Sequence, residues 1–540
     1  MKQRWGVIAL VAITSFLSGG WLLQRGGGPG DLYRSARLFE DVLSHISAYY
    51  VDSIPQAELY QRATTGLLEQ LHDPYSTLLQ GDDYRQLTET TTGNYGGLGI
   101  QIDVRDGWIT VVAPLPETPA ERAGIETGDQ IIAVDGKSTE GWNNDQAVKA
   151  LRGTPGTEVE LQIRRAGFTK PVTYRLTRAQ IHIRSVPPGT LFPGGVGYVS
   201  LNPVAENSAQ ELRNEIKALL GKGMKTLVLD LRNNPGGLLD QGVRVADLFL
   251  DRGAEIVSTR GRTRESTKRF LDEAKQEWPN LPIVVLVNEG TASAAEIISG
   301  ALQDHDRAVV VGVPTFGKGL VQTLFQFSDN TALKLTTGRW YTPSGRTIQR
   351  TARSEEDQAR QALVEAEGAP DSSATADTAR PVFRTDLGRV VRGGGGIVPD
   401  LIVRPDSLTD GERQFAAALG AKFAEYRDVL TSYALQLKND KAITSEDFRV
   451  TPAMRAEVLR RLRAKGVELS DETFAKGASL VDQQLGYEIA RYLFGRPSEF
   501  RRRARDDRQM QAALGLLRRA QNPKDLLALA AAAAPTVGRY

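Results

Sequence analysis

The stretch Thr226-Leu-Val-Leu-Asp-Leu-Arg-Asn-Asn-Pro-Gly-Gly237 decides the fold of the middle of this 540-residue chain. Its apolar start predicts a buried strand, and the Asn-Asn-Pro-Gly-Gly that follows predicts a tight turn. Residues 238–250 then have helical spacing, and apolar strands at 283–287 and 308–312 flank a second predicted helix at 294–303. Strands alternating with helices are typical of an α/β sheet with helices packed on it.

Composition and periodicity divide the rest of the chain around this block, which we place at 183–405. Residues 31–92 are mostly helical by pattern, with apolar positions suited to packing or a dimer contact, and 93–182 form a compact mixed unit. Residues 406–540 are helical to the end. Within the block, 351–380 is rich in Ala, Glu, Ser and Asp, which predicts a surface insertion that is mobile or transiently helical. We therefore expect an α/β (α+β) fold with helical regions at both ends.

Composition excludes several kinds of chemistry. The chain has no cysteine and four histidines, His45, His72, His182 and His305. Disulfides, a thiolate nucleophile and a lipid-bearing cysteine are therefore ruled out, and histidines this scattered predict no metal site. The net charge of +2 indicates no nucleic-acid partner. We expect no cofactor.

Residues 1–30 have the features of a membrane anchor. Lys2 and Arg4 precede an uncharged segment, 5–23, and a glycine-rich tether follows it. A membrane span needs about 20 apolar residues, whereas the core of a cleaved signal peptide has about 7–15. Positive charge before the segment places the N-terminus in the cytoplasm and the rest outside it. The sequence predicts a periplasmic cell-envelope protein anchored in the inner membrane, with cleavage near Ser18 as the alternative.

Ser293 and Lys318 are the strongest candidates for chemistry. Ser293, in Asn288-Glu-Gly-Thr-Ala-Ser-Ala-Ala-Glu296, opens a predicted helix, and Lys318 lies in Pro314-Thr-Phe-Gly-Lys-Gly-Leu-Val-Gln322. A serine hydroxyl becomes nucleophilic when a neutral base takes its proton. Lysine becomes that base if its pKa falls from about 10.4 to about 7, a differential of roughly 4–5 kcal/mol that burial without a carboxylate partner supplies. No acidic residue occurs between positions 311 and 327.

The surroundings of Ser293 suit acyl transfer. The amide of Ala294 would lie at the positive end of the predicted helix, where it favours an oxyanion. A second donor comes from the turn after the first strand, in which Gly236 and Gly237 let the backbone approach a ligand closely.

Each feature also has an ordinary structural explanation. Ser293 with Glu296 forms the pattern of a capping box, and most serines in that pattern only cap a helix. Glycines around Lys318 are typical of a solvated turn, and the turn lacks the spacing of a phosphate loop. His305, flanked by aspartates, suggests a Ser-His-Asp triad, but a helix over 293–303 would carry it roughly 15 Å or more away. We expect His305 to be a surface residue at the helix end.

Taken together, these segments resemble the C-terminal processing peptidases, or tail-specific proteases, of serine peptidase family S41. The resemblance implies a crotonase-like ββα protease core, with Ser293 as nucleophile and Lys318 as general base. It also implies that Gln322 orients the lysine and that Ala294 and Gly236 or Gly237 supply the oxyanion amides. Four residues of straight strand span about 13 Å, so the Gln322 role requires a bend near Gly317 or Gly319. The further matching segments are 229–237, 290–297, 300–304, 341–349 and 396–403.

The mixed unit, 93–182, resembles a PDZ domain inserted in the chain. Tyr95-Gly-Gly-Leu-Gly-Ile100 resembles its carboxylate-binding loop, and Gly128-Asp-Gln-Ile-Ile-Ala-Val-Asp-Gly136 matches a second segment. Amides freed by glycine would receive a peptide's terminal carboxylate, while the adjacent strand edge pairs with its backbone. The candidate peptide-binding residues are Leu98, Gly99, Ile100, Val148 and Leu151.

These observations predict a serine endopeptidase that forms an acyl-enzyme and recognises C-terminal tails of envelope proteins through its PDZ domain. The alternative is a catalytically silent PDZ scaffold at the cell envelope. Expected partners are protein substrates with exposed C-termini and the membrane. A homo-oligomer and a regulatory partner protein stay open as alternatives.

Overall fold

The computed structural model describes residues 29–165, 168–328, 330–350 and 380–533. The expected anchor at 5–23 and all but the last residue of the expected insertion at 351–380 lie outside these ranges. No helix among the described residues is both long enough and apolar enough to span a membrane.

The chain forms two compact units, the first made of residues 1–84 and 322–336. Its described part contains α2 (Pro29–Tyr49), α3 (Gln56–Glu69) and β1 (Thr77–Gln80). The region 31–92 is mostly helical, as its pattern predicts, and it also contains the short strand β1, which pairs antiparallel with β18 (Thr331–Tyr341). Four residues are too few to show an alternating pattern, and the pairing with a distant strand makes this segment a strand.

The second unit, residues 85–321 and 337–540, contains a six-stranded sheet. Its strands run parallel from the second to the sixth, and the first is an antiparallel edge. The three predicted apolar strands lie at its centre, which confirms the α/β prediction. In order across the sheet they are β10 (Thr190–Phe192), β11 (Val196–Ser200), β12 (Thr226–Asp230), β15 (Ile283–Val287), β16 (Val309–Gly312) and β21 (Leu401–Ile402).

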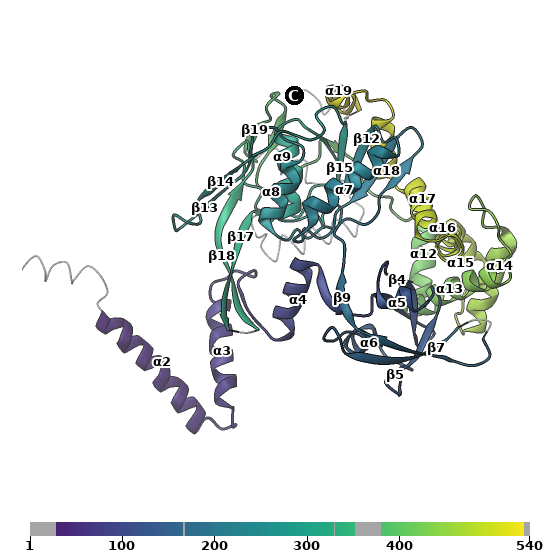
Figure 1. Ribbon diagram of the computed structural model, residues 1–540, viewed down its shortest axis with the longest axis horizontal. Helices are drawn as coiled ribbons and strands as arrows, with labels where there is room; N and C mark the ends of the chain where they lie inside the picture. The colour runs from purple at the N-terminus through teal and green to yellow at the C-terminus, as the bar shows by residue number, and fades with distance from the viewer. Residues whose placement is uncertain (1–28, 166–167, 329, 351–379, 534–540) are drawn as a thin grey trace, which may run out of the picture. The chain divides into compact units, whose positions relative to one another are not determined.

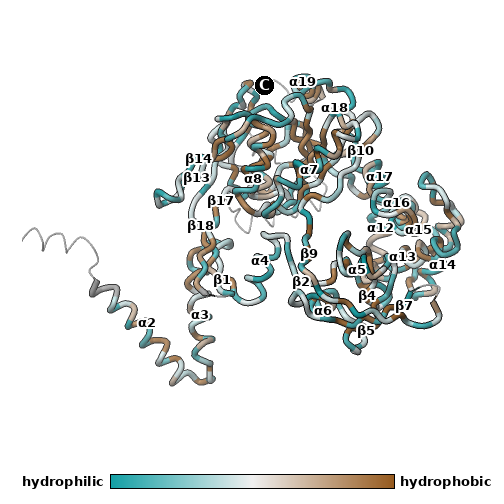
Figure 2. The backbone as a smooth tube through the Cα atoms, in the orientation of Figure 1, coloured by the Kyte–Doolittle hydropathy of each residue, from teal (hydrophilic) through white to brown (hydrophobic). Residues whose placement is uncertain are grey.

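Both faces of this sheet are covered, which explains why its central strands are continuous apolar runs. Every residue of β12, β15 and β16 is buried. Residues such as Leu229 and Val285 pack on one face beneath α7 (Ser208–Gly221), α8 (Leu239–Asp247) and α9 (Ala294–Asp304). Residues such as Val228 and Val284 pack on the other, beneath α18 (Arg508–Leu517) and α19 (Pro523–Ala533), and the brown stretches of Figure 2 gather between α7 and α18.

A second sheet contains β13 (Glu255–Gly261), β14 (Lys268–Leu271), β17 (Leu320–Ser328) and β18. β13 pairs with the end of β18, from Ser258 opposite Tyr341 to Gly261 opposite Gly338. The division between the two compact units crosses both β17 and β18, after Val321 and after Thr336. The ends of this long ribbon therefore belong to different units.

The PDZ region has the expected mixed architecture of strands and helices. Its helices are α5 (Pro119–Arg122) and α6 (Asn144–Leu151), and α6 begins with a capping box formed by Asn143 and Gln146. An antiparallel pair, β2 (Asn94–Gly97) and β9 (Ala179–His182), joins both ends of the region to the rest of the chain. The sheet strands are β3 (Ile100–Arg105), β4 (Trp108–Pro114), β5 (Gln130–Val134), β6 (Lys137–Ser138), β7 (Glu158–Arg164) and β8 (Val172–Thr177).

The C-terminal region is helical as predicted, and it serves two cores. Its first part packs around a hydrophobic core of its own that includes Phe415, Tyr426 and Leu485, whereas α18 and α19 leave this bundle to cover the six-stranded sheet (Figure 1). The bundle contains α12 (Asp410–Leu419), α13 (Phe423–Asn439), α14 (Pro452–Ala464), α15 (Asp471–Lys476), α16 (Ala478–Ile489), a π-helical turn (Ala490–Phe494) and α17 (Arg496–Asp506).

Candidate active site

Ser293 ends the turn after β15 and stands at the start of α9 in a strained conformation. Its φ is +54° and its ψ is −119°, a region that residues with a side chain rarely adopt. Such strain costs about 1–3 kcal/mol and persists where the surroundings enforce it. The turn is held by Thr291, whose hydroxyl donates to the Leu231 carbonyl at 2.8 Å and accepts from the Asn288 amide at 3.0 Å.

Ser293 and Glu296 form a capping box at the start of α9. The Ser293 amide donates to Glu296 Oε2 at 2.8 Å, while the Glu296 amide donates to the Ser293 carbonyl oxygen. The Ser293 side chain is partly buried.

Glu296 joins the serine turn to the lysine turn. It is completely buried, and its Oε2 accepts both the Ser293 amide and the Lys318 amide, the latter at 2.9 Å. Its Oε1 accepts the Gly317 amide at 2.7 Å and the hydroxyl of Thr315. Both amides donate to the same oxygen, so the distance between the backbone nitrogens of Ser293 and Lys318 cannot exceed the sum of the two hydrogen-bond lengths.

The electrostatics of Glu296 reflect this burial. Desolvation raises the pKa of its carboxyl group, and the four hydrogen bonds it accepts, led by the one from Thr315, act in the opposite direction. The hydrogen bonds require acceptor lone pairs on both carboxyl oxygens, which the ionised form supplies most fully.

Lys318 is held in a turn that precedes β17. Gly317 has a φ of +88°, and a β-carbon there would lie 3.1 Å from the Ile348 carbonyl oxygen, so the turn requires glycine. The buried Trp340 donates from its indole nitrogen to the Lys318 carbonyl at 3.0 Å, and the Gly319 amide donates to Gln349 Oε1 at 2.9 Å. Lys318 itself is partly buried.

Gln322 lies on β17, on the far side of the division between the two units. Its side-chain amide donates to the Tyr75 carbonyl at 2.6 Å, within its own unit. The strand begins only at Leu320, so the segment from Lys318 to Gln322 is not the straight strand assumed for the 13 Å estimate.

The turn after β12 lies against Ser293. A β-carbon on Gly236 would be 2.7 Å from Ser293 Cβ and 2.8 Å from the Ala294 amide nitrogen, so only glycine fits there. The Gly236 amide is already engaged, because it donates to Asn234 Oδ1 at 2.9 Å. Among the described residues, the amides of Gly237 and Ala294 have no hydrogen-bond acceptor.

Asparagine side chains connect the turn after β12 to the turn after β15. The Asn233 amide donates to Asn288 Oδ1 at 2.8 Å, and Asn288 Nδ2 donates back to Asn233 Oδ1 at 2.9 Å. The fully buried Asn234 donates to the Leu201 carbonyl, and its own carbonyl accepts the Ala292 amide at 2.9 Å. Sequence analysis assigned no role to these side chains or to Thr315, although they lie within the segments that it singled out.

The PDZ candidates lie at one end of β3 and on α6. Leu98 and Leu151 belong to the hydrophobic core of this region, and Ile100 packs against that core, while Val148 is partly buried. Gly99 has a φ of +76°, and a β-carbon there would lie 2.3 Å from Thr118 Cβ. In the part of the chain that the structure describes, the Leu98 and Gly99 amides have no acceptor, as a carboxylate-binding loop requires.

His305 follows the end of α9, at the opposite end from Ser293, and is not the surface residue that we expected. It is partly buried, with Nδ1 2.7 Å from an Asp386 carboxyl oxygen and Nε2 2.7 Å from the Glu255 carbonyl oxygen. The sequence around His305 could not predict this burial, because both partners are distant from it in the chain. Across the described ranges, no cluster of His, Cys, Asp or Glu has the arrangement of a metal site.

Comparison with known proteins identifies the family. Residues 195–357 match the model of peptidase family S41, and residues 86–164 match that of the PDZ domain. The chain is 40% identical to a carboxy-terminal-processing protease of Bartonella bacilliformis over 321 residues, which are 59% of this chain and 73% of that protein. It is 35% identical to carboxy-terminal processing protease CtpA of Bacillus subtilis, over 62% of this chain and 72% of that protein.

Among solved structures, the chain is similar to a photosystem II D1 C-terminal processing protease. The identity is 32% and the TM-score 0.34, over 57% of this chain and 83% of that one. The sequence relationships show that the chain belongs to the carboxy-terminal processing proteases of serine peptidase family S41 and carries a PDZ domain. It is a serine-type hydrolase.

Proposed function

We propose that this protein is an endopeptidase in which Ser293 is the nucleophile and Lys318 the general base. The observation that carries this proposal is the Glu296 carboxylate oxygen shared by the Ser293 and Lys318 amides. It brings together two residues that lie far apart in the sequence. The strained φ of Ser293 also favours a nucleophile over a structural serine.

The reaction proceeds through an acyl-enzyme. The neutral amine of Lys318 accepts the hydroxyl proton as Ser293 Oγ bonds to the carbonyl carbon of the scissile peptide. When the carbon–nitrogen bond breaks, the Lys318 ammonium returns that proton to the leaving amine. Lys318 then takes a proton from water as the water oxygen bonds to the ester carbon. When the bond from that carbon to Ser293 Oγ breaks, Lys318 returns the proton to Oγ, and the acid product leaves.

Two backbone amides stabilise the tetrahedral intermediate. Ala294 supplies the first, at the N-terminus of α9, where the helix dipole favours a negative oxygen. We assign the second to Gly237 rather than Gly236, because the Gly236 amide is committed to Asn234. Gln322 is proposed, on the family pattern alone, as the residue that orients the lysine.

The PDZ domain is proposed to select substrates by their C-terminal tails. Support comes from the uncommitted amides of Leu98 and Gly99 and from the apolar Ile100 and Val148 nearby. Leu98 and Leu151 would line only the floor of such a pocket, because both are core residues. On the basis of the sequence, we also propose that the protein lies in the cell envelope and is anchored in the membrane. A homo-oligomer and a regulatory partner protein are further parts of this proposal.

Digestion of an unstructured protein, with and without an apolar C-terminal tail, tests the proposed function. We expect wild type to cleave it, faster with the tail, and Ser293→Ala to lower kcat at least about a thousandfold. Lys318→Arg keeps the positive charge but cannot lose its proton, so it should be equally inactive. If wild type and both variants behave alike, the chain is a PDZ scaffold and the proposal is lost.

A further inference from the structure

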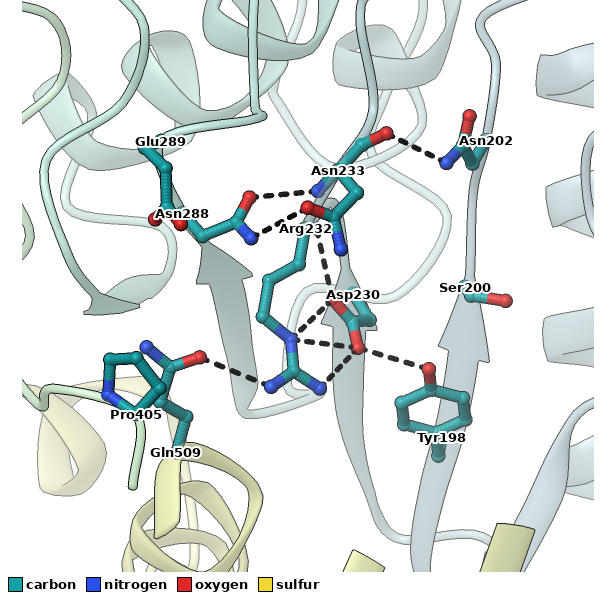
Figure 3. Close-up of a pocket in the computed structure, with 10 residues that line it drawn as sticks. All are labelled: Tyr198, Ser200, Asn202, Asp230, Arg232, Asn233, Asn288, Glu289, Pro405 and Gln509. Carbon is teal, nitrogen blue, oxygen red and sulfur yellow. Dashed lines mark hydrogen bonds and ion pairs between the residues drawn. The ribbon is translucent and has the colours of Figure 1, made fainter. Parts of the chain in front are cut away.

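Arg232 connects the C-terminal helical region to the turn that carries the proposed oxyanion amide. It follows β12 and directly precedes Asn233, the first residue of the 233–237 turn. Its guanidinium donates to Asp230 at 2.7 Å on one side and to Gln509 Oε1 at 3.1 Å on the other (Figure 3). It also donates to Asp507 at 2.7 Å. Asp507, the N-cap of α18, and Gln509, in its first turn, thus contact the residue that precedes the oxyanion turn.

The Arg232 contacts are largely removed from water. Asp230 is buried, and Tyr198 donates to its Oδ2 at 3.0 Å. Burial lowers the pKa of Arg232, but the hydrogen bonds and charges of Asp230 and Asp507 outweigh it and leave the pKa above its usual value. A polar cavity of about 570 Å³, lined by Arg232, Asn233, Asn288 and Gln509 among others, lies beside this network.

The partners on α18 are themselves held in place. Asp507 is the N-cap of α18 and accepts the Met510 amide at 3.0 Å, so its carboxylate has a defined orientation. Gln509 donates from Nε2 to the Val403 carbonyl at 2.8 Å, which leaves its oxygen for Arg232. The apolar face of α18 packs on the sheet through residues that include Met510 and Leu514.

The far end of the same turn faces Ser293. Asn202 Nδ2 donates to the Asn233 carbonyl at 2.9 Å, and Asn233 has a φ of +56°. This bond and this backbone conformation fix the direction of the chain after Arg232. Gly236 then fits against Ser293 with no room for a β-carbon. Because only four residues lie between Arg232 and Gly237, a shift of the arginine moves the amide that faces the intermediate.

Resting on the proposed function, we infer that Asp507 and Gln509 are positioning residues for the oxyanion turn, acting through Arg232. Neither residue touches substrate. Both lie outside the segments that match the family models, which end at residue 357. The C-terminal helical region is therefore part of the catalytic apparatus, because it sets where the Gly237 amide points.

The variant Asp507→Asn separates this role from helix capping. Asparagine caps a helix about as well as aspartate but cannot form the ion pair with Arg232. The double variant Asp507→Asn, Gln509→Ala removes both contacts. Asp506→Asn is the matched control, since the neighbouring carboxylate accepts only the Tyr487 hydroxyl, at 2.7 Å, among the hydrogen bonds resolved. Asp507→Glu keeps the charge and should restore much of the loss.

Kinetics on a short peptide without a tail exclude effects of the PDZ domain. Since an oxyanion donor contributes about 10²–10³ in kcat, displacing one should lower kcat about fivefold in the single variant and about tenfold in the double, with KM little changed. Thermal unfolding of Asp507→Asn and Asp506→Asn should be similar. Values of kcat within twofold of wild type in both variants, or losses that merely follow thermal stability, overturn the inference.

Amide hydrogen exchange across 233–238 gives a readout that needs no activity. The double variant should exchange faster in this segment than wild type or Asp506→Asn, because the turn has lost one of the contacts that hold it. Unchanged exchange there overturns the inference even if cleavage is slower. Faster exchange in a protein whose wild type does not cleave peptides contradicts the proposed function instead.

Discussion

At the scale of single residues, the decisive side chain is Glu296. The sequence presents it as the far end of a capping box, yet its carboxylate accepts three backbone amides and one hydroxyl in a fully buried position. Two of those amides belong to Ser293 and Lys318. A carboxylate with this arrangement positions two catalytic candidates without touching a substrate.

Glu296→Gln should destabilise the protein by about 1–3 kcal/mol and lower kcat at least about tenfold. The substitution puts an N–H₂ where an acceptor stood, so at least one buried amide loses its partner. Urea unfolding and peptide cleavage measure the two effects. Glu289→Gln, an exposed change in the same turn, is the control and should leave unfolding unchanged. Full stability and activity in Glu296→Gln would show that the shared contact is dispensable.

At the scale of elements, two strand-to-helix connections meet to form the candidate site. The turn after β12 brings Gly236 against Ser293, and the turn after β15 ends in Ser293 itself. Both turns follow carboxyl ends of parallel strands, where α/β sheets place their ligands. Neighbouring strands therefore bring together loops separated by more than fifty residues.

Gly236→Ala should abolish most cleavage, because its methyl group would lie 2.6 Å from the Ala292 carbonyl oxygen and 2.7 Å from Ser293 Cβ. The turn would have to move away from the nucleophile, and we expect at least about a hundredfold lower kcat. Gly253→Ala is a matched control, since Gly253 has the same φ of +89° with nothing within 4 Å of an added β-carbon. Equal activity in the two variants would contradict the close approach.

At the scale of the whole molecule, the C-terminal region is built into the second unit. It covers one face of the six-stranded sheet and also contacts the PDZ region, where Arg427 donates to Asp103 at 2.8 Å. The free energy of unfolding of this unit therefore includes contributions from buried ionisable side chains at contacts between its helices and strands. One such group is Asp272, after β14, beside Asp247 at the end of α8.

Burial, together with Asp247 and Asp251, raises the pKa of Asp272 from 3.8 to about 7, against the hydrogen bond from the Ala274 amide. The folded state therefore favours the protonated form, and this contribution is present below pH 3.8 and lost as pH rises to about 7. Asp272→Asn, which stays neutral, should gain stability relative to wild type across that window, on the order of 1 kcal/mol. Urea unfolding at pH 5 and pH 8 measures it. If the difference in unfolding free energy between the two proteins is the same at pH 5 and pH 8, the raised pKa of Asp272 is contradicted.

The sequence by itself determined the layers and the candidate chemistry. Apolar runs and helical spacing located β12, β15, α8 and α9, because periodicity is a local property, and the serine and lysine segments stood out by their glycines and small residues. Only the tertiary structure decided that β1 pairs with β18, that Glu296 joins the two turns, that Gly237 rather than Gly236 has an uncommitted amide, and that α18 reaches Arg232. Each of these depends on a contact between residues distant in the chain, and no local pattern encodes which distant partner a side chain will meet.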